Sequence, residues 1–296
     1  MENINNKIIN PSFLALFGAV FLMFSAVDFY IPVMPFYVLN IGGGEAAVGM
    51  VMGLFTFFSV VLRPFQGRNL NRSGRKRLLV TGIALYVFAG LGLLFLPSLP
   101  LLYLLRSIQG LGWGAFLLAF NTLTLDLAPP GKSGEAVGIM GIAPPLSLAT
   151  APLFSEQLRI STSENYILLF LVTSLVALLA LIIAVQVREP AMKKSDCYKP
   201  ELFSKKVITP SLIIFCMTFN LGSIFTFLPL LGENRDLHVV GYSFTIFAVT
   251  TMISRPLAGK ISDTLGRPKV FLPGLVVAAS AMLLIAFSFS EKRLML

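Results

Sequence analysis

Asp28 is the residue of this sequence whose type and surroundings point most directly to chemistry. It lies in an apolar stretch that contains no basic residue. A carboxylate inside a membrane forms a pair, faces water or stays protonated, and each outcome makes it a candidate proton or cation site. The alternative is that Asp28 caps an interrupted helix or bonds to Tyr30.

Arg106 is a second ionisable residue within an apolar stretch, and it is followed by Gln109, Gly110 and Gly112. An arginine in a membrane helix costs at least ~2.5 kcal/mol unless the side chain faces a wet cavity or a partner. We therefore expect Arg106 to line a cavity, where Gln109 would contribute hydrogen bonds. A structural ion pair is the alternative for Arg106, and the glycines would allow close helix packing.

Other chemistry-bearing residues are scarce. The sequence has one histidine, His238, and two cysteines, Cys197 and Cys216. This supply allows neither a disulfide framework nor a metal cluster. The sequence also offers no constellation of residues typical of an enzyme, so we expect no enzyme activity, no metal and no cofactor.

The composition indicates the elements that must position these residues. With 56% hydrophobic and 12% charged residues, the chain must place most of its surface against lipid. Stretches of about 20 apolar residues can cross a bilayer as helices. Nine such stretches cover residues 13–37, 46–65, 78–97, 100–125, 135–154, 166–187, 207–231, 239–257 and 270–289. We therefore predict an all-α membrane protein with about nine transmembrane helices.

A short basic pattern occurs twice, 192 positions apart. The first copy contains Arg63, Gly67, Asn71, Gly74 and Arg75, and the second contains Arg255, Gly259, Asp263, Gly266 and Arg267. The correspondence continues without gaps from Gly49 and Gly241 to Gly82 and Gly274. Parallel repeats of this kind are typical of one class of secondary transporter. The same offset carries Asp28 onto Asn220, so a pseudo-two-fold axis would place these polar groups around a central cavity.

The longest polar segment, residues 188–206, contains Pro190 and Pro200 and separates the two halves, as a linker does. We expect a six-helix N-terminal bundle over residues 1–187, a cytoplasmic linker over 188–206 and an incomplete bundle of three helices over 207–296. A second half as long as the first would continue roughly ninety residues past Leu296. We therefore expect the second half to be cut short.

The net charge of +9 is explained by where the cations lie along the chain. They gather in the even-numbered loops, and the odd-numbered loops hold little beyond Arg159 and Arg235. The positive-inside rule then places the N-terminus and every even loop in the cytoplasm. This distribution predicts contact with membrane lipids and gives no reason to expect nucleic acid as a partner.

The loop at residues 67–77 resembles the signature loop of the major facilitator superfamily, and the whole chain resembles the superfamily's drug:proton antiporter group of about twelve helices. Asn71 stands where an aspartate is usual, whereas Asp263 in the second copy keeps the acid. The resemblance implies that the two loops latch the closed cytoplasmic face. The alternative is that their cations only set the topology.

Elementary chemistry suggests how the signature loop works. Gly67 and Gly74 would let a short connection fold back tightly and let helices approach, because glycine has no Cβ. The basic residues, Arg75 among them, would meet lipid phosphates or a nearby acid, for which Asp126 at the end of the fourth span is the best candidate.

Two more segments resemble motifs of the same superfamily. Arg106 with Gln109 resembles its second motif, whose arginine is implicated in proton coupling. Gly141, Pro144, Pro145 and Pro152 weakly resemble the antiporter motif, with Ala151 and Ser155-Glu156 replacing its glycines. Small residues and prolines there permit a kinked, closely packed helix.

The resemblance implies a monomeric transporter of the cytoplasmic membrane that moves a small solute by alternating access, with proton-coupled efflux as the expected reaction. Asp28 and Arg106 would couple protons to substrate. One alternative is a shortened product without transport activity, either inert or associated with another membrane protein. A further alternative is uptake by proton symport.

Overall fold

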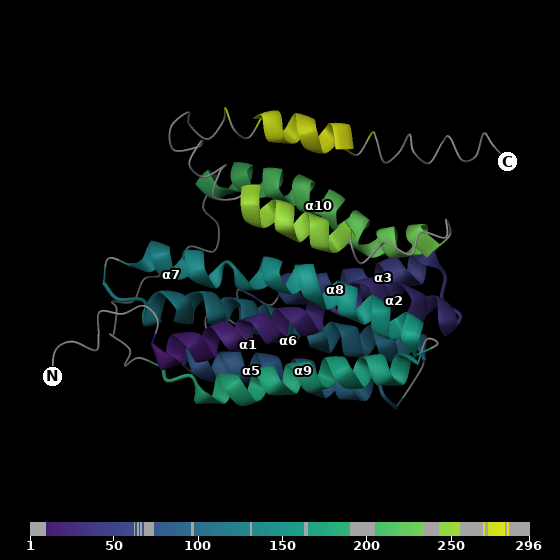
Figure 1. Cartoon of the computed structure of the whole chain (residues 1–296), viewed down its shortest axis with the longest axis horizontal. Helices are drawn as coiled ribbons and strands as arrows, with labels where there is room; N and C mark the ends of the chain where they lie inside the picture. The colour runs from purple at the N-terminus through teal and green to yellow at the C-terminus, as the bar shows by residue number, and fades with distance from the viewer. Residues whose placement is uncertain are drawn as a thin grey trace. The chain divides into compact units, whose positions relative to one another are not determined.

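The computed structural model describes residues 10–61, 63, 65, 67, 74–95, 98–130, 132–162, 165–189, 205–233, 243–254, 269, 272–281 and 283. These residues are helical or lie in turns and short connections, and none of them forms a strand. The chain divides into two compact units, Met1–Ala248 and Val249–Leu296. Figure 1 shows the helices.

The first predicted span consists of two consecutive helices, α1 (Pro11–Asp28) and α2 (Tyr30–Asn40). The side chain of Asn10 caps α1 by accepting a hydrogen bond of 2.8 Å from the Phe13 amide. The interruption at Phe29 has a local cause, because Pro32 has no N–H to donate to the carbonyl four residues earlier, which is that of Asp28. Asp28 is therefore the last residue of α1 and stands at the interruption.

Helix α6 (Leu99–Leu127) packs against both α3 (Glu45–Val61) and α5 (Arg75–Gly92) at close range. A Cβ on Gly110 or Gly114 would collide with the carbonyl oxygens of Phe55 and Ser59 in α3, and a Cβ on Gly82 would lie 2.7 Å from the Gly112 oxygen. Two faces of α6 thus bring their backbone against a neighbouring helix, as small residues allow in membranes. The predicted packing role of Gly110 and Gly112 is confirmed.

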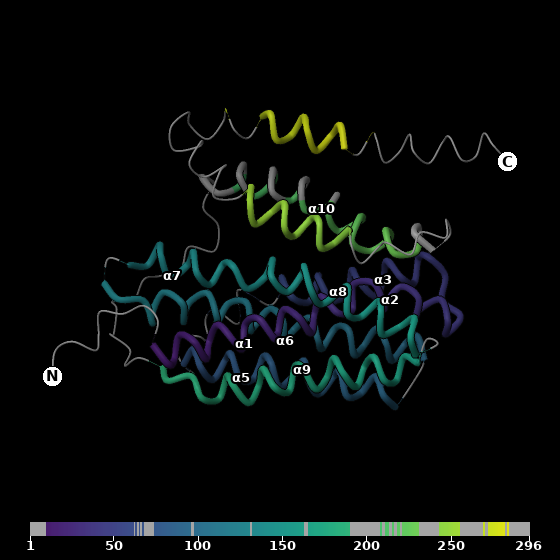
Figure 2. Tube along the Cα trace, in the orientation of Figure 1, coloured from purple at the N-terminus to yellow at the C-terminus, as the bar shows by residue number. Residues whose placement is uncertain are grey.

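The fifth span is also interrupted, between α7 (Ser133–Met140) and α8 (Ala143–Ser161). Gly141 and Ile142 form the turn, and Pro144 occupies the first turn of α8, where its missing N–H costs nothing. Figure 2 shows α8 beside α1, and α1 packs along both α8 and α9 (Tyr166–Gln186).

The helices of the later spans are α10 (Lys205–Glu233) and the apolar segments Ser243–Ser254 and Leu272–Ala281. Within the first unit, α10 packs against α2, and Phe225 meets the ring of Phe244 at 5.5 Å. Every predicted span thus coincides with helix in the described part of the chain.

The apolar surface of these helices agrees with a membrane protein. Within the described residues, four stretches are long and apolar enough to cross a bilayer, namely Pro11–Asn40, Leu99–Leu127, Ser133–Ser161 and Tyr166–Gln186. Large side chains such as Phe88, Phe154 and Ile167 are more than 60% exposed, which is unfavourable in water and favourable in lipid. The prediction of an all-α, multi-helix membrane protein is confirmed.

Candidate functional site

Asp28 is held by a residue of another span. Its side chain is buried, and the Ser147 hydroxyl donates a hydrogen bond of 2.6 Å to Asp28 Oδ2. Ser147 is itself fully buried and lies in the second turn of α8. The expected alternative partner, Tyr30, does not bond to this carboxylate in the described residues, and its side chain interacts with Gln109 instead. The bond therefore joins the last residue of α1, at the interruption of the first span, to the second turn of α8.

Arg106 is enclosed by aromatic rings. Its guanidinium carbon lies 4.5 Å from the centre of the Phe55 ring and 5.2 Å from that of Tyr30. Arg106 Nη1 donates a hydrogen bond of 2.9 Å to Gln109 Oε1, and Nη2 lies 3.6 Å from the sulfur of Met52. A weakly hydrated, planar guanidinium suits such stacking better than an ammonium does.

The surroundings of Arg106 correct one expectation. We expected its side chain to face a wet cavity, but it is 3% exposed and packs against residues of α2 and α3. No carboxylate pairs with it in the described part of the chain, so the alternative of a structural ion pair is not observed either. The side chains of Tyr30 and Gln109 interact beside it, and Arg106 Nε has no described hydrogen-bond partner.

One cavity of about 630 Å³ lies between α1, α8 and α9. Its lining is mostly apolar and includes Phe21, Phe29 and Phe154, whereas Asp28 and Arg106 do not line it. Four hydroxyl groups in the lining donate to carbonyls of their own helices, those of Ser25, Thr150, Ser161 and Thr173, and Gln157 also lines the cavity. The cavity therefore offers apolar surface and does not bring the predicted polar residues together.

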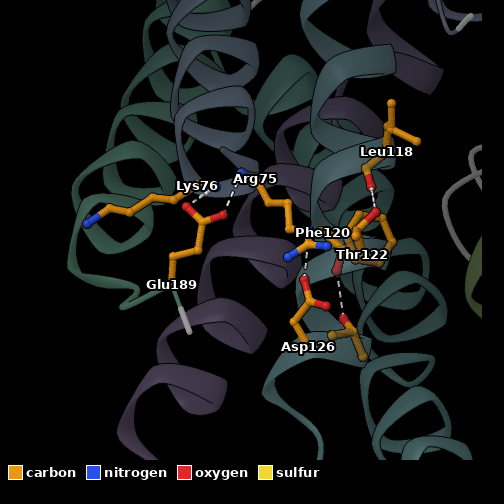
Figure 3. A network of polar contacts seen from close by, with 8 residues as sticks. Arg75, Lys76, Leu118, Phe120, Thr122, Asp126 and Glu189 are labelled. Atoms are coloured by element: carbon orange, nitrogen blue, oxygen red, sulfur yellow. Dashed lines mark hydrogen bonds and ion pairs between the residues drawn. The ribbon is translucent and has the colours of Figure 1, made fainter. Parts of the chain in front are cut away.

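The first signature loop forms the expected ion pair. Arg75 Nε lies 2.9 Å from Asp126 Oδ2, and both side chains are partly buried. Figure 3 shows Arg75 reaching from the start of α5 to the end of α6, while the side chain of Lys76 points away from Asp126. The pairing predicted for Asp126 is confirmed; its gating role remains a prediction.

The two glycines of this loop differ in what they do. Gly74 has φ of 87°, a left-handed conformation that glycine adopts without strain. Gly67 is helical, and no described atom lies within 4 Å of the position of a Cβ there. The expected close approach is therefore absent at Gly67, and only Gly74 has the geometry that requires glycine.

The fifth span has the interruption that its prolines and small residues permit, and α8 packs along α1. The interruption at Gly141 lies just before Pro144 and Pro145, and Pro152 lies inside α8. A Cβ on Gly141 would meet only carbonyls of its own helix, 3.1 Å and 3.3 Å away. No other helix therefore approaches Gly141 among the described atoms.

Several predicted site residues lie outside the described part of the chain. These are Asn71 in the first signature loop and all of Gly259, Asp263, Gly266 and Arg267 in the second. Asn220 lies within α10, but its side chain is not described. The repeat, the linker and the placement of Asp28 and Asn220 around a central cavity therefore stay predictions.

Comparison with known proteins identifies the family. The profile of the Major Facilitator Superfamily matches residues 16–291. The chain belongs to the major facilitator superfamily. This is a family of transporters whose members cross the membrane several times, which agrees with the apolar helices described above.

Relatives within the superfamily carry multidrug names. The chain is 28% identical to the multidrug resistance protein MdtG of Enterobacter lignolyticus, covering 92% of this chain and 68% of that protein. It is 26% identical to the multi-drug resistance efflux pump PmrA of Streptococcus pneumoniae, covering 95% of this chain and 74% of the pump.

Solved superfamily structures share the fold. A bacterial homologue of the human lysosomal transporter Spinster, inward-facing and occupied, superposes with a TM-score of 0.69 at 18% identity, covering 85% of this chain and 60% of that structure. The nucleoside transporter NupG gives a TM-score of 0.64 at 12% identity, covering 87% of this chain and 69% of that structure. The chain thus spans about two thirds of the length of these superfamily members.

Proposed function

We propose that the chain is a secondary active transporter of the cytoplasmic membrane that exports a small, largely apolar solute in exchange for protons. The observation that carries this proposal is the bond between Asp28 and Ser147. It joins two interrupted membrane helices through a group that can gain or lose a proton. Protonation or deprotonation of Asp28 would change the strength of the contact between α1 and α8. Proton binding would thereby alter how these two helices pack.

The direction of transport is supported by the relatives. Both relatives quoted above are named for multidrug resistance or efflux, and they match more than 90% of this chain. The solved structures include a D-xylose-proton symporter, but at 14% identity that likeness concerns the fold alone. Efflux is therefore the better-supported proposal, and uptake by symport is the second candidate.

Arg106 and the ion pair of Arg75 with Asp126 have separate roles in this proposal. The buried guanidinium lies next to Tyr30, the second residue after Asp28, and can sense a change at the interruption of the first span through the Tyr30 ring. The ion pair of Arg75 with Asp126 would close the cytoplasmic face together with the second signature loop. Alternating access would then follow from movement of one bundle against the other around these contacts.

A transport assay with two readouts tests the proposal. The purified chain is reconstituted in liposomes, and a pH gradient is imposed across their membrane. The gradient-driven transport of a panel of lipophilic drugs and cations is then measured. We expect Asp28→Asn to lower gradient-driven transport at least about tenfold, because a carboxamide neither gains nor loses a proton near neutral pH. Substrate exchange without a gradient should persist, because exchange needs no net proton movement.

The control is Glu135→Gln, which removes an exposed carboxylate near the start of α7. It should leave both readouts unchanged. Gradient-driven transport that survives Asp28→Asn at the wild-type rate would remove the coupling role of Asp28. Absence of transport by the wild-type chain for every compound class would remove the proposed function.

A further inference from the structure

The start of α5 concentrates positive charge. Its first turn contains Arg75, Lys76 and Arg77, it has no acidic residue there, and Gly74 at the cap provides no side-chain hydrogen bond. The first turn of a helix carries partial positive charge and leaves backbone N–H groups without partners. The start of α5 therefore needs an anion that its own sequence does not supply.

Glu189, which lies three residues after the end of α9, supplies that anion. Its Oε1 accepts a hydrogen bond of 2.7 Å from the Arg75 amide, and its Oε2 accepts one of 3.2 Å from the Lys76 amide. Figure 3 shows the carboxylate facing both amides. The two partners lie 114 and 113 positions before Glu189 in the chain.

Gly74 fits the same arrangement. A Cβ at this position would lie 3.1 Å from Glu189 Oε2, and its φ of 87° is one that other residues adopt only with strain. The glycine thus permits both the turn before α5 and the approach of the carboxylate. A larger residue at position 74 would therefore disturb both the tight turn and the position of the Glu189 carboxylate.

The residues beside Glu189 are also fastened to the bundle. Val187 is fully buried in the core, and the Arg188 amide lies 3.4 Å from the Ser12 hydroxyl at the start of α1. Residues 187–189 therefore follow α9 as an anchored segment that contacts the starts of α1 and α5. The predicted linker begins at this segment.

We propose that Glu189 is a positioning residue that caps α5 and, by fixing the start of that helix, holds Arg75 in line with Asp126. The carboxylate fastens the first residues of the linker to the signature loop. A displacement of residues 187–189 would then also displace Arg75 relative to Asp126. The gating meaning of that contact rests on the proposed function, whereas the cap does not.

Hydrogen–deuterium exchange of the full chain in lipid nanodiscs tests the cap. Glu189→Ala should raise the exchange rates of the Arg75 and Lys76 amides about tenfold, because the carboxylate is their only described partner. Glu189→Gln keeps one good acceptor and should give a smaller increase. The matched control, Glu135→Gln, should leave the peptide over residues 74–80 unchanged. Exchange in Glu189→Ala within twofold of the wild type would overturn the proposal.

A double-mutant cycle separates positioning from simple capping. Glu189→Ala and Arg75→Gln should each raise exchange two- to threefold in the peptide over residues 120–128, which contains Asp126, and the combined variant should exceed neither. Lys76→Gln, whose side chain points away from Asp126, should have no effect there. Effects that multiply in the combined variant would overturn the positioning role.

These measurements do not depend on transport. If the exchange pattern is as expected but the liposome assay finds no transport, the proposed function fails and the positioning role stands. If transport is observed and Asp28→Asn abolishes its coupling, but exchange near Glu189 is unchanged, the positioning role fails and the proposed function stands.

Discussion

At the scale of single residues, two buried polar groups contact partners on other helices. The carboxylate of Asp28 bonds to Ser147, 119 positions away, and the guanidinium of Arg106 contacts rings of α2 and α3. A hydrogen bond between membrane helices contributes about 0.6 kcal/mol on average and at most about 1.7 kcal/mol. Such bonds select an arrangement of helices more than they provide its total stability.

Ser147 gives the first prediction. Ser147→Ala removes the donor to Asp28 and should lower the midpoint of thermal unfolding by about 2–5 °C, from a loss of roughly 1 kcal/mol. Ser155→Ala is the matched control, because Ser155 is equally buried in α8 but donates to Pro152 of its own helix. Nanoscale fluorimetry of the purified variants provides the comparison. Equal midpoints for the two variants would show that the contact with Asp28 contributes nothing.

Arg106 gives the second prediction. Arg106→Lys keeps the positive charge but loses the planar group that lies over Phe55 and Tyr30, and each such contact is worth about 0.5–2 kcal/mol. We expect gradient-driven transport to fall about tenfold or more. Arg77→Lys, at an exposed arginine in the first turn of α5, should keep wild-type transport. Full activity of Arg106→Lys would mean that only charge matters at this position.

At the scale of elements, α6 should tolerate little change where its glycines meet α3 and α5. Gly110→Ala would place a methyl group against the carbonyl of Phe55, so α3 and α6 must move apart. A forced backbone shift of this kind costs about 1–3 kcal/mol, and the unfolding midpoint should fall by roughly 2–10 °C. Gly138→Ala in α7 meets no described atom and should be neutral or stabilising. A destabilised Gly138→Ala with an unaffected Gly110→Ala would contradict this account of α6 packing.

The same scale shows what the sequence predicts and what it does not. Apolar length predicts the spans, because lipid requires about 20 apolar residues in each helix, and prolines predict the interruption before α8. The cap of α5 by Glu189 and the bond from Ser147 to Asp28 were not predicted. Both join residues more than 110 positions apart, and no local pattern specifies such a contact. The one usable signal was three cations at the start of α5 with no acid nearby.

At the scale of the whole molecule, the arrangement of charge predicts how the chain lies in the membrane. The cation-rich loops alternate with loops that hold few cations. The positive-inside rule then puts the starts of α5 and α7 in the cytoplasm and the connection between α8 and α9 outside. The contacts of Arg75 with Asp126 and with Glu189 would all lie on the cytoplasmic side.

Cysteine labelling in intact cells tests this orientation. In a background with Cys197→Ser and Cys216→Ser, single variants Ser133→Cys and Ser161→Cys place thiols at exposed positions on opposite sides of the fifth span. A maleimide that cannot cross membranes should label Ser161→Cys in intact cells and label Ser133→Cys only after the cells are opened. The reverse pattern would invert the topology. It would also place Asp126 and Glu189 outside, where a cytoplasmic latch could not operate, so the proposed roles of both signature loops depend on this result.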